Sequence, residues 1–177
     1  QNNINVIVKN DLGDKATGKT DKNGEVTVPE VEKTEHHSAY VVGYTDGTFG
    51  PERNMTRSEA AAIFARLLAD KNGDNISPVA KTKFSDVPAY AWYSGYVKYL
   101  NNNGVTYGHS KTIFAPDEQI TRAEFTTMAV RFFDVYGDGD AEIMEQFKSF
   151  DDVSDGYWAA EYIKAAAKHG WITGYGD

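Results

Sequence analysis

The sequence feature that most limits the possible folds of this chain is an internal repeat. The tetrapeptide Phe-Ser-Asp-Val at 84–87 recurs as Phe-Asp-Asp-Val at 150–153, 66 positions later. A second block, Met-Thr-Arg-Ser-Glu at 55–59, recurs as Ile-Thr-Arg-Ala-Glu at 120–124, 65 positions later. Single residues that recur after 66 positions are Trp92, Gly104 and Gly108, which match Trp158, Gly170 and Gly174. Several residue classes repeat in register, which indicates a repeated supersecondary unit.

The copies of this unit are unequal and divide the 177 residues into four segments. Residues 36–80 form a partial first copy that lacks its opening half, and residues 81–146 form a complete second copy. Residues 147–177 form a third, truncated copy that stops before its Thr-Arg-x-Glu block. Residues 1–35 lie outside the repeat.

Residues 1–35 carry a strand pattern instead. Apolar residues alternate over Asn5–Val8, and Gly24–Pro29 alternates in the same way after the turn signal at Asp21–Gly24. We expect a β-hairpin or the last strands of an upstream β-sandwich-like domain. A two-stranded hairpin is only marginally stable in water, so we interpret this segment as a remnant of a larger sheet.

The repeat unit predicts two amphipathic helices. Thr56 and Thr121 each precede a Glu by three residues at the start of an apolar periodic run, which is the pattern of a capping box. The earlier helix carries apolar residues at helical spacing from Trp92 to Leu100, and Gly104 suits the left-handed position after its end. Such helix–turn–helix pairs bury their apolar stripes against one another. We therefore expect a mainly α fold, a pseudo-symmetric bundle of helix–turn–helix repeats with a short β segment at the N-terminus.

The composition excludes several classes of function. The chain contains no cysteine, which removes disulfides and thiolate sites. Its formal net charge is −8 and its pI is about 5.0, so no basic stripe is available to neutralise nucleic-acid phosphates. No run approaches the roughly 18 apolar residues of a membrane span. We expect no nucleic-acid partner and no membrane insertion, and any bound anion must be held by a few local donors.

Arg57 and Arg122 are the first candidate binding residues. Both fall at the first position of a predicted helix, where the helix dipole makes a cation unfavourable by about 0.3–1 kcal/mol. A guanidinium beside free backbone N–H groups forms a compact anion site that suits a carboxylate. In the structural alternative, each arginine pairs with an acidic residue of the next copy, such as Asp86 or Asp152. The sequence leaves both possibilities open.

Two tryptophans and the glycine-rich turns are further candidates. Trp92 and Trp158 offer aromatic faces that stack on sugars, but both begin apolar stripes, which favours a place in the core. The turns that contain Gly43, Gly47 and Gly108 permit a close approach of the backbone to a ligand. Turn geometry alone explains these glycines equally well.

No metal site or catalytic group of residues emerges from the sequence. The acidic segments 70–75 and 134–140 resemble calcium loops, but neither has the glutamate at position twelve that an EF-hand loop requires. His36 and His37 have no further ligands at metal-site spacing, and no nucleophile motif joins Ser, His and Asp. We expect no metal, no cofactor and no catalysis within this chain.

The repeated motifs together resemble the S-layer homology family. They are Tyr-x-Asp-Gly-Thr-Phe-x-Pro at 44–51, Thr-Arg-Ser-Glu at 56–59, Ile-Thr-Arg-Ala-Glu at 120–124, Phe-Ser-Asp-Val at 84–87 and Phe-Asp-Asp-Val at 150–153. The resemblance covers about residues 38–177. Proteins of this family usually carry three such repeats folded into a pseudo-threefold helical spindle. Grooves between the repeats bind secondary cell-wall polymers, commonly through a terminal pyruvyl-ketal sugar.

The resemblance implies a ligand role for the residues that match the family's motifs. The motif arginine implies contact with the ketal carboxylate, and the turns resemble loops that line the grooves. The second copy departs from the family, because it reads Gly-His-Ser-Lys-Thr at 108–112 where Gly-Tyr-x-Asp-Gly is preferred. The residues implied as ligand contacts are Arg57, Arg122, Asp46, Gly47, Gly43, Gly108, Trp92 and Trp158.

The predicted function is therefore a non-catalytic anchor. The module binds an anionic, pyruvylated cell-wall polysaccharide and holds a bacterial surface protein outside the cell, in a cell wall or surface layer of Gram-positive type. The first alternative is a self-assembly module that holds other surface-layer subunits. The second is the anchor of an exported enzyme whose catalytic domain lies outside this chain.

Overall fold

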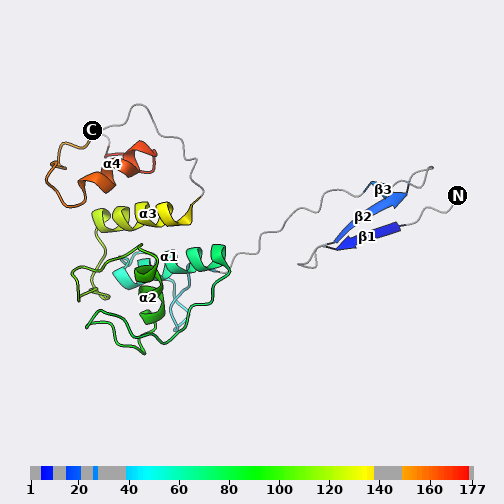
Figure 1. The fold of residues 1–177 in the computed structure, drawn as a ribbon, viewed down its shortest axis with the longest axis horizontal. Coiled ribbons are helices and arrows are strands. Elements are labelled where there is room, and N and C mark those ends of the chain that lie inside the picture. The colour runs from blue at the N-terminus through cyan, green and yellow to red at the C-terminus, as the bar shows by residue number, and fades with distance from the viewer. Residues whose placement is uncertain (1–4, 10–14, 21–25, 28–38, 138–148, 176–177) are drawn as a thin grey trace. The chain divides into compact units, whose positions relative to one another are not determined.

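A computed structural model describes residues 5–9, 15–20, 26–27, 39–137 and 149–175 of the chain (Figure 1). These residues belong to two compact units, Gln1–His37 and Ser38–Asp177. Each unit is described by itself.

The first unit contains a three-stranded antiparallel sheet in the order β1-β2-β3. Its strands are β1 (Asn5–Lys9), β2 (Lys15–Thr20) and β3 (Val26–Thr27). β1 confirms the strand predicted from Asn5–Val8, and β3 lies inside the second predicted strand. The sequence did not predict β2, because Lys-Ala-Thr-Gly-Lys-Thr lacks the apolar alternation that marks a half-buried strand. The predicted turn at 21–24 lies outside the described residues.

The second unit is helical in the part that the structure describes. Its helices are α1 (Arg57–Asn72), α2 (Ser94–Asn102), α3 (Arg122–Tyr136) and α4 (Ala160–Lys168). The expectation of a mainly α fold is confirmed. Of the helices in the described residues, none combines the length and the apolar character that a bilayer crossing requires.

Both α1 and α3 begin with the predicted capping box. The Thr56 hydroxyl accepts from the Glu59 amide at 3.2 Å, and the Glu59 carboxylate accepts from the Thr56 amide at 2.7 Å. Thr121 and Glu124 repeat this exchange at 3.2 and 3.0 Å. Each box satisfies amides that the start of a helix otherwise leaves unpaired. The arginines that follow the two threonines are therefore the first residues of their helices, as predicted.

The helices α2 and α4 start later than the apolar pattern indicates. Trp92 and Trp158 each lie two residues before the helix, in the preceding turn. Gly104 and Gly170 follow the helix ends with φ values of 76° and 67°, which confirms the predicted left-handed positions.

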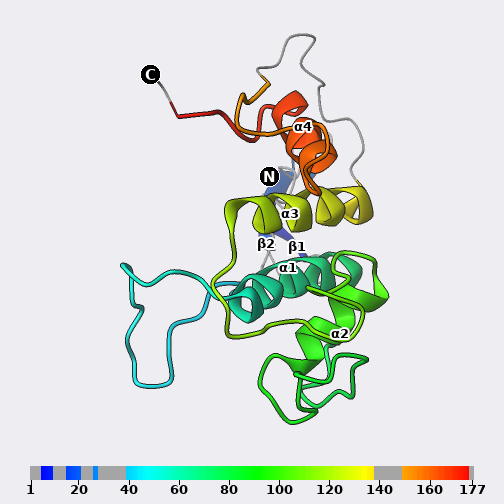
Figure 2. The same ribbon diagram turned by 90° about the vertical axis from the view of Figure 1, so that its left-hand side faces the viewer.

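The helices pack in pairs that are offset from the sequence repeat. α2 packs on α1, α4 packs on α3, and α1 contacts α3. Figure 2 shows α3 between α1 and α4, with α2 on the other side of α1. One sequence copy runs from α2 to α3. Each packed pair therefore joins the closing helix of one copy to the opening helix of the next.

The core of this unit lies between α1, α2 and the segment that leads to α3. The Phe114 ring packs on the Phe84 ring with centroids 5.6 Å apart, so the Phe-x-Asp-Val motif is part of the core. After Phe114 the chain passes the start of α1, where Gln119 forms a β-bridge with Thr56. The largest fully buried apolar side chains are Phe114, Leu68, Leu100, Val97 and Val105.

Candidate functional site

Arg57 is buried at the start of α1, with 4% of its surface exposed. Its Nε donates to the carbonyl oxygen of Phe114 at 2.8 Å, and its Nη1 donates to Oε1 of Glu124 at 2.7 Å. The first two amides of α1 donate to the carbonyl oxygens of Glu118 and Pro116 at 2.9 and 3.0 Å. The amides at the start of α1 are therefore not free to bind an anion.

Arg57 therefore forms an ion pair with an acidic residue of the next copy, as the structural alternative predicts, but this residue is neither Asp86 nor Asp152. Glu124 of the second copy pairs with Arg57, whereas Asp86 accepts from the amides of Phe114 and Ala115 at 2.9 and 2.7 Å. A buried guanidinium needs this compensation, because an unpaired charge in the interior is costly.

We expect the Arg57–Glu124 pair to make the stability of the second unit depend on pH. Burial alone raises the pKa of Glu124, but hydrogen bonds from Thr121 and the charge of Arg57 outweigh burial and lower this pKa. A carboxyl with a lowered folded-state pKa contributes stability that is present above its unfolded pKa of about 4.3. That stability is lost as the pH falls through the folded-state pKa.

The measurement is the urea unfolding midpoint as a function of pH in the acidic range. The midpoint of the wild-type chain should fall below about pH 4.5, and Glu124→Gln should flatten this part of the curve because the titrating group is gone. An equally steep fall in Glu124→Gln would contradict the assignment to this pair.

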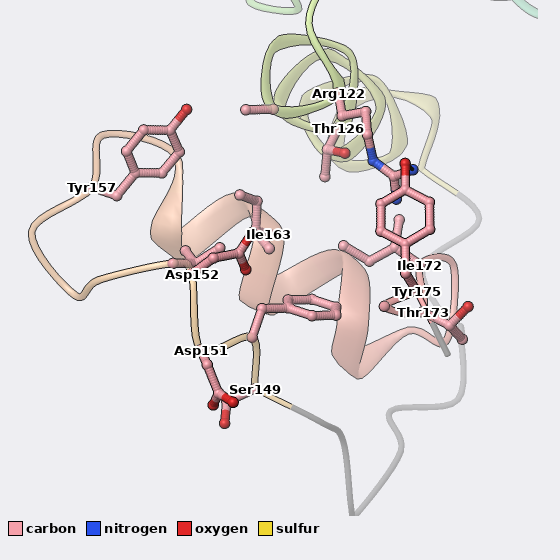
Figure 3. Close-up of a pocket in the computed structure, with 14 residues that line it drawn as sticks. Arg122, Thr126, Ser149, Asp151, Asp152, Tyr157, Ile163, Ile172, Thr173 and Tyr175 are labelled. Carbon is pink, nitrogen blue, oxygen red and sulfur yellow. Dashed lines mark hydrogen bonds between the residues drawn. The ribbon is translucent and has the colours of Figure 1, made fainter. Parts of the chain in front are cut away.

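Arg122 lies in a different environment, a pocket of about 520 Å³ that we name the C-terminal pocket (Figure 3). Its guanidinium is exposed, donates to the hydroxyl of Tyr175 at 2.7 Å and lies 4.8 Å from the centroid of that ring. No carboxylate within the described residues forms an ion pair with Arg122. Phe150 and Asp152 also line this pocket, which lies between the start of α3 and the segments on either side of α4.

A second pocket, of about 490 Å³, lies between the second and third copies, and we name it the inter-repeat groove. The turn after α2, one face of α3 and the turn before α4 build its walls. The groove brings together three of the predicted residues, Arg57, Gly108 and Trp158. Other side chains that line it are Tyr107, His109, Glu124, Arg131 and Tyr157.

The remaining predicted residues lie outside the inter-repeat groove. Gly43 of the first copy and Trp92 of the second copy hold the repeat positions that Gly108 and Trp158 hold in the groove. Outside the groove are Arg122 in the C-terminal pocket, Trp92 in the turn before α2, and Gly43, Asp46 and Gly47 in the loop before α1.

The two tryptophans are solvent-exposed, not core residues. Trp92 and Trp158 are 55% and 57% exposed. Trp158 stands beside Tyr157 with ring centroids 5.8 Å apart, and both rings line the groove. The core alternative is wrong because the two residues precede their helices and turn away from the buried faces. An exposed aromatic face is available to stack on a sugar.

Arg131 is a groove residue that the sequence analysis missed. Its guanidinium lies 4.8 Å from the Tyr107 ring and 4.7 Å from the Tyr162 ring, and it donates to the Tyr162 hydroxyl at 2.9 Å. Within the described part of the chain, Arg131 has no ion pair. Arg66 and Tyr96 repeat the contact with a centroid distance of 4.8 Å. The 65-residue spacing of the two arginines was the signal that could have found Arg131.

The repeats identify the family once sequence comparison is added to this geometry. A family model for the S-layer homology domain matches residues 30–61, 83–126 and 149–177. The chain belongs to the S-layer homology family. The three matched segments contain the turn, the cap and the Phe-x-Asp-Val motifs described above.

Curated relatives agree with this assignment to the S-layer homology family. Cell surface glycoprotein 1 of Acetivibrio thermocellus is 38% identical over 148 residues, or 80% of this chain. A cellulosome-anchoring protein of the same organism is 36% identical over 164 residues, or 90% of the chain. The surface-layer 125 kDa protein of Lysinibacillus sphaericus is 34% identical over 135 residues, or 76% of the chain. The aligned regions span only 6%, 35% and 10% of these three proteins.

Packing, backbone conformation and local hydrogen bonds each explain residues in the turns of the S-layer homology repeats. A Cβ on Gly108, whose φ is 89°, would lie 2.3 Å from the Phe84 ring, so packing requires glycine here. Gly47 has a φ of 84° and open space around it, so its backbone alone requires glycine. Asp46 accepts from the side chain and the amide of Thr48, and these bonds lower the pKa of its carboxyl.

The described residues contain no group of three or more His, Asp or Glu side chains placed to hold a metal ion. His36, His37 and residues 138–140 of the second acidic segment lie outside the described residues.

Proposed function

We propose that this chain is a non-catalytic module that anchors its protein to the bacterial cell wall, on the outside of the cell. Its ligand in this proposal is an anionic secondary cell-wall polysaccharide, bound in the inter-repeat groove through a pyruvylated terminal sugar. The names of the relatives, a cellulosome-anchoring protein and a surface-layer protein, support an anchoring role. The activity of any longer protein that contains this chain lies outside the proposal.

The observation that carries the proposal is the combination of groups in the inter-repeat groove. Trp158 offers an exposed aromatic face, Gly108 contributes backbone, and Arg131 contributes a cation to the same groove. Sugar rings stack on aromatic faces, and a guanidinium binds a carboxylate through paired hydrogen bonds. An acidic sugar matches this set of groups.

Electrostatics favours Arg131 as the residue that binds the carboxylate of the sugar in this groove. The chain carries a net charge of −8, so an anionic polymer is held only where a local cation outweighs the general repulsion. Glu124 already balances the charge of Arg57, whereas Arg131 contacts the rings of Tyr107 and Tyr162. The charge of Arg131 is therefore less compensated than that of Arg57, and its guanidinium is available to pair with a carboxylate of the ligand.

The other predicted contacts stay predictions within this proposal. Arg57 lines the groove and its charge is balanced by Glu124, whereas Arg122 is exposed in the C-terminal pocket. By the repeat, the first copy and the start of the second copy together offer an equivalent set of groups for a second sugar. That set comprises Gly43, Asp46, Gly47, Arg66 and Trp92.

We expect Trp158→Ala and Arg131→Gln to weaken binding to cell walls. The test is co-sedimentation with purified Gram-positive walls, before and after mild acid extraction of the secondary polymer. Each substitution should lower the affinity about tenfold, which corresponds to about 1.4 kcal/mol, because each removes a central contact. Extraction of the polymer should abolish sedimentation of the wild-type chain.

Tyr90→Ala is the matched control for these variants. Tyr90 is an aromatic residue with 86% of its surface exposed, and it lines neither pocket. A control sample that contains no cell walls measures how much of the protein sediments by self-association alone. Wild-type protein that stays in the supernatant with untreated walls, or equal binding by Trp158→Ala and Tyr90→Ala, would refute the proposal.

A further inference from the structure

The turn that follows α2 differs in charge from its repeat equivalent. It reads Gly-His-Ser-Lys-Thr where the first copy reads Gly-Tyr-Thr-Asp-Gly. His109 therefore stands at the position of Tyr44, and Lys111 stands at the position of Asp46. The second copy thus carries a titratable imidazole and a cation where the first copy carries a neutral ring and an anion.

The two turns nevertheless share one backbone contact and one side-chain position. The amides of Tyr44 and His109 each donate to the carbonyl oxygen four residues further on, at 2.7 and 2.8 Å. The Tyr44 hydroxyl donates to Oε1 of Glu59 at 2.9 Å. In the second copy, Nδ1 of His109 lies 3.7 Å from Oε1 of Glu124, the repeat equivalent of Glu59. An imidazole therefore replaces a phenol hydroxyl beside the same capping carboxylate.

His109 is also a wall of the inter-repeat groove, and 56% of its side chain is exposed. Glu124 pairs with Arg57, so Arg131 leaves the charged groups of the groove with a net charge of +1 while the imidazole is neutral. Protonation of His109 raises this net charge to +2. The titratable and charged side chains that line the groove with His109 are Arg57, Tyr107, Glu124, Arg131 and Tyr157.

Two lysines belong to the segments that meet at this end of the groove. Lys111 is exposed in the same turn as His109. Lys83 is exposed as well, and its Nζ lies 4.9 Å from the centroid of the Phe84 ring. Gly108 approaches the same ring so closely that a Cβ on it would lie 2.3 Å from the ring. Lysines are positively charged at neutral pH, so this edge of the groove is cationic even when the imidazole is neutral.

We propose that His109 and Lys111 form a second anion-binding position at the edge of the inter-repeat groove, where a further acidic group of the polysaccharide binds while Arg131 binds the first. The position rests on the proposed function, because its ligand is the same polymer. Binding strengthens as His109 gains a proton, since imidazole is the side chain that changes its charge between pH 5 and 8. Carboxylates of acidic sugars stay ionised over that range. The first copy, with Tyr44 and Asp46, lacks this position.

The test compares binding at pH 5.5 and pH 7.5, at constant ionic strength, with two probes. The first probe is purified Gram-positive cell wall, measured by co-sedimentation. The second is trigalacturonate, a soluble trisaccharide with one carboxylate on each sugar, whose titration is followed by nuclear magnetic resonance at the amide and imidazole signals of His109. The affinity of the wild-type chain for each probe should be at least about threefold higher at pH 5.5, as expected for one added charge near the protein surface.

The first copy supplies the residues for the two test variants. His109→Tyr should remove the difference between the two pH values while binding at pH 7.5 is kept, because tyrosine stays neutral at both. Lys111→Asp should lower the affinity at least about threefold at both pH values and leave the pH dependence in place. Lys98→Asp is the matched control, because it makes the same change in net charge at an exposed position of α2 that lines neither pocket.

The outcomes separate this position from the proposed function. Wall binding that is equal at both pH values, or that keeps its full pH dependence in His109→Tyr, would overturn the second anion position and leave the anchor in place. A wild-type chain that ignores walls but binds trigalacturonate with the expected pH dependence would refute the anchor and support the position. If neither probe binds more tightly at pH 5.5, the position does not exist.

Discussion

Arg57→Met should destabilise the second unit by about 3 kcal/mol, whereas Arg122→Met should change its stability by less than about 0.5 kcal/mol. The two arginines share the same local sequence and the same helix position. Only Arg57 is buried in an ion pair, so only its loss leaves Glu124 without its cation and the Phe114 carbonyl without its donor. Comparison of the two variants therefore separates the effect of burial on stability from the effect of local sequence.

The measurement is urea unfolding followed by circular dichroism at 222 nm, at concentrations where the chain is monomeric. Arg122→Met is the matched control, because it removes the same charge and side-chain volume from the exposed C-terminal pocket. A double variant, Arg57→Met with Glu124→Gln, should recover part of the loss, since no unpaired charge is left behind. Equal losses in Arg57→Met and Arg122→Met would show that the contact with Glu124 contributes nothing.

The helix starts and ends could be predicted because they depend on neighbouring residues alone. The capping box needs only a threonine and a glutamate three positions apart, and a glycine after a helix needs only its own backbone freedom. Thr56, Thr121, Gly104 and Gly170 were therefore predicted correctly.

The partners of the site residues could not be predicted, because they depend on distant segments. Arg57 donates to the Phe114 carbonyl and to the Glu124 carboxylate, which lie 57 and 67 residues further along the chain, so nothing near Arg57 encodes these partners. Trp158 fits a helical stripe by spacing, yet its helix begins two residues later and leaves the ring exposed. Arg131 does repeat in the sequence, but only the structure places it in the groove beside Trp158.

Asp86→Ala should destabilise the second unit by about 3 kcal/mol. The Asp86 carboxylate accepts from the amides of Phe114 and Ala115, and both of these residues are buried. Each buried donor left without an acceptor costs about 1–3 kcal/mol. Ala115 also has a φ of 59°, a conformation that costs a non-glycine residue about 1–2 kcal/mol and that the carboxylate helps to hold.

Asp152→Ala is the control for this effect, because Asp152 holds the same motif position in the third copy. It is exposed, and no hydrogen bond to its carboxylate is present among the described residues, so its removal should leave the urea midpoint of the monomer unchanged. Asp86→Asn should fall between Asp86→Ala and the wild type, because the amide keeps one acceptor oxygen. If Asp86→Ala unfolded at the same urea concentration as Asp152→Ala, the aspartate of the motif would not hold the Phe114 segment.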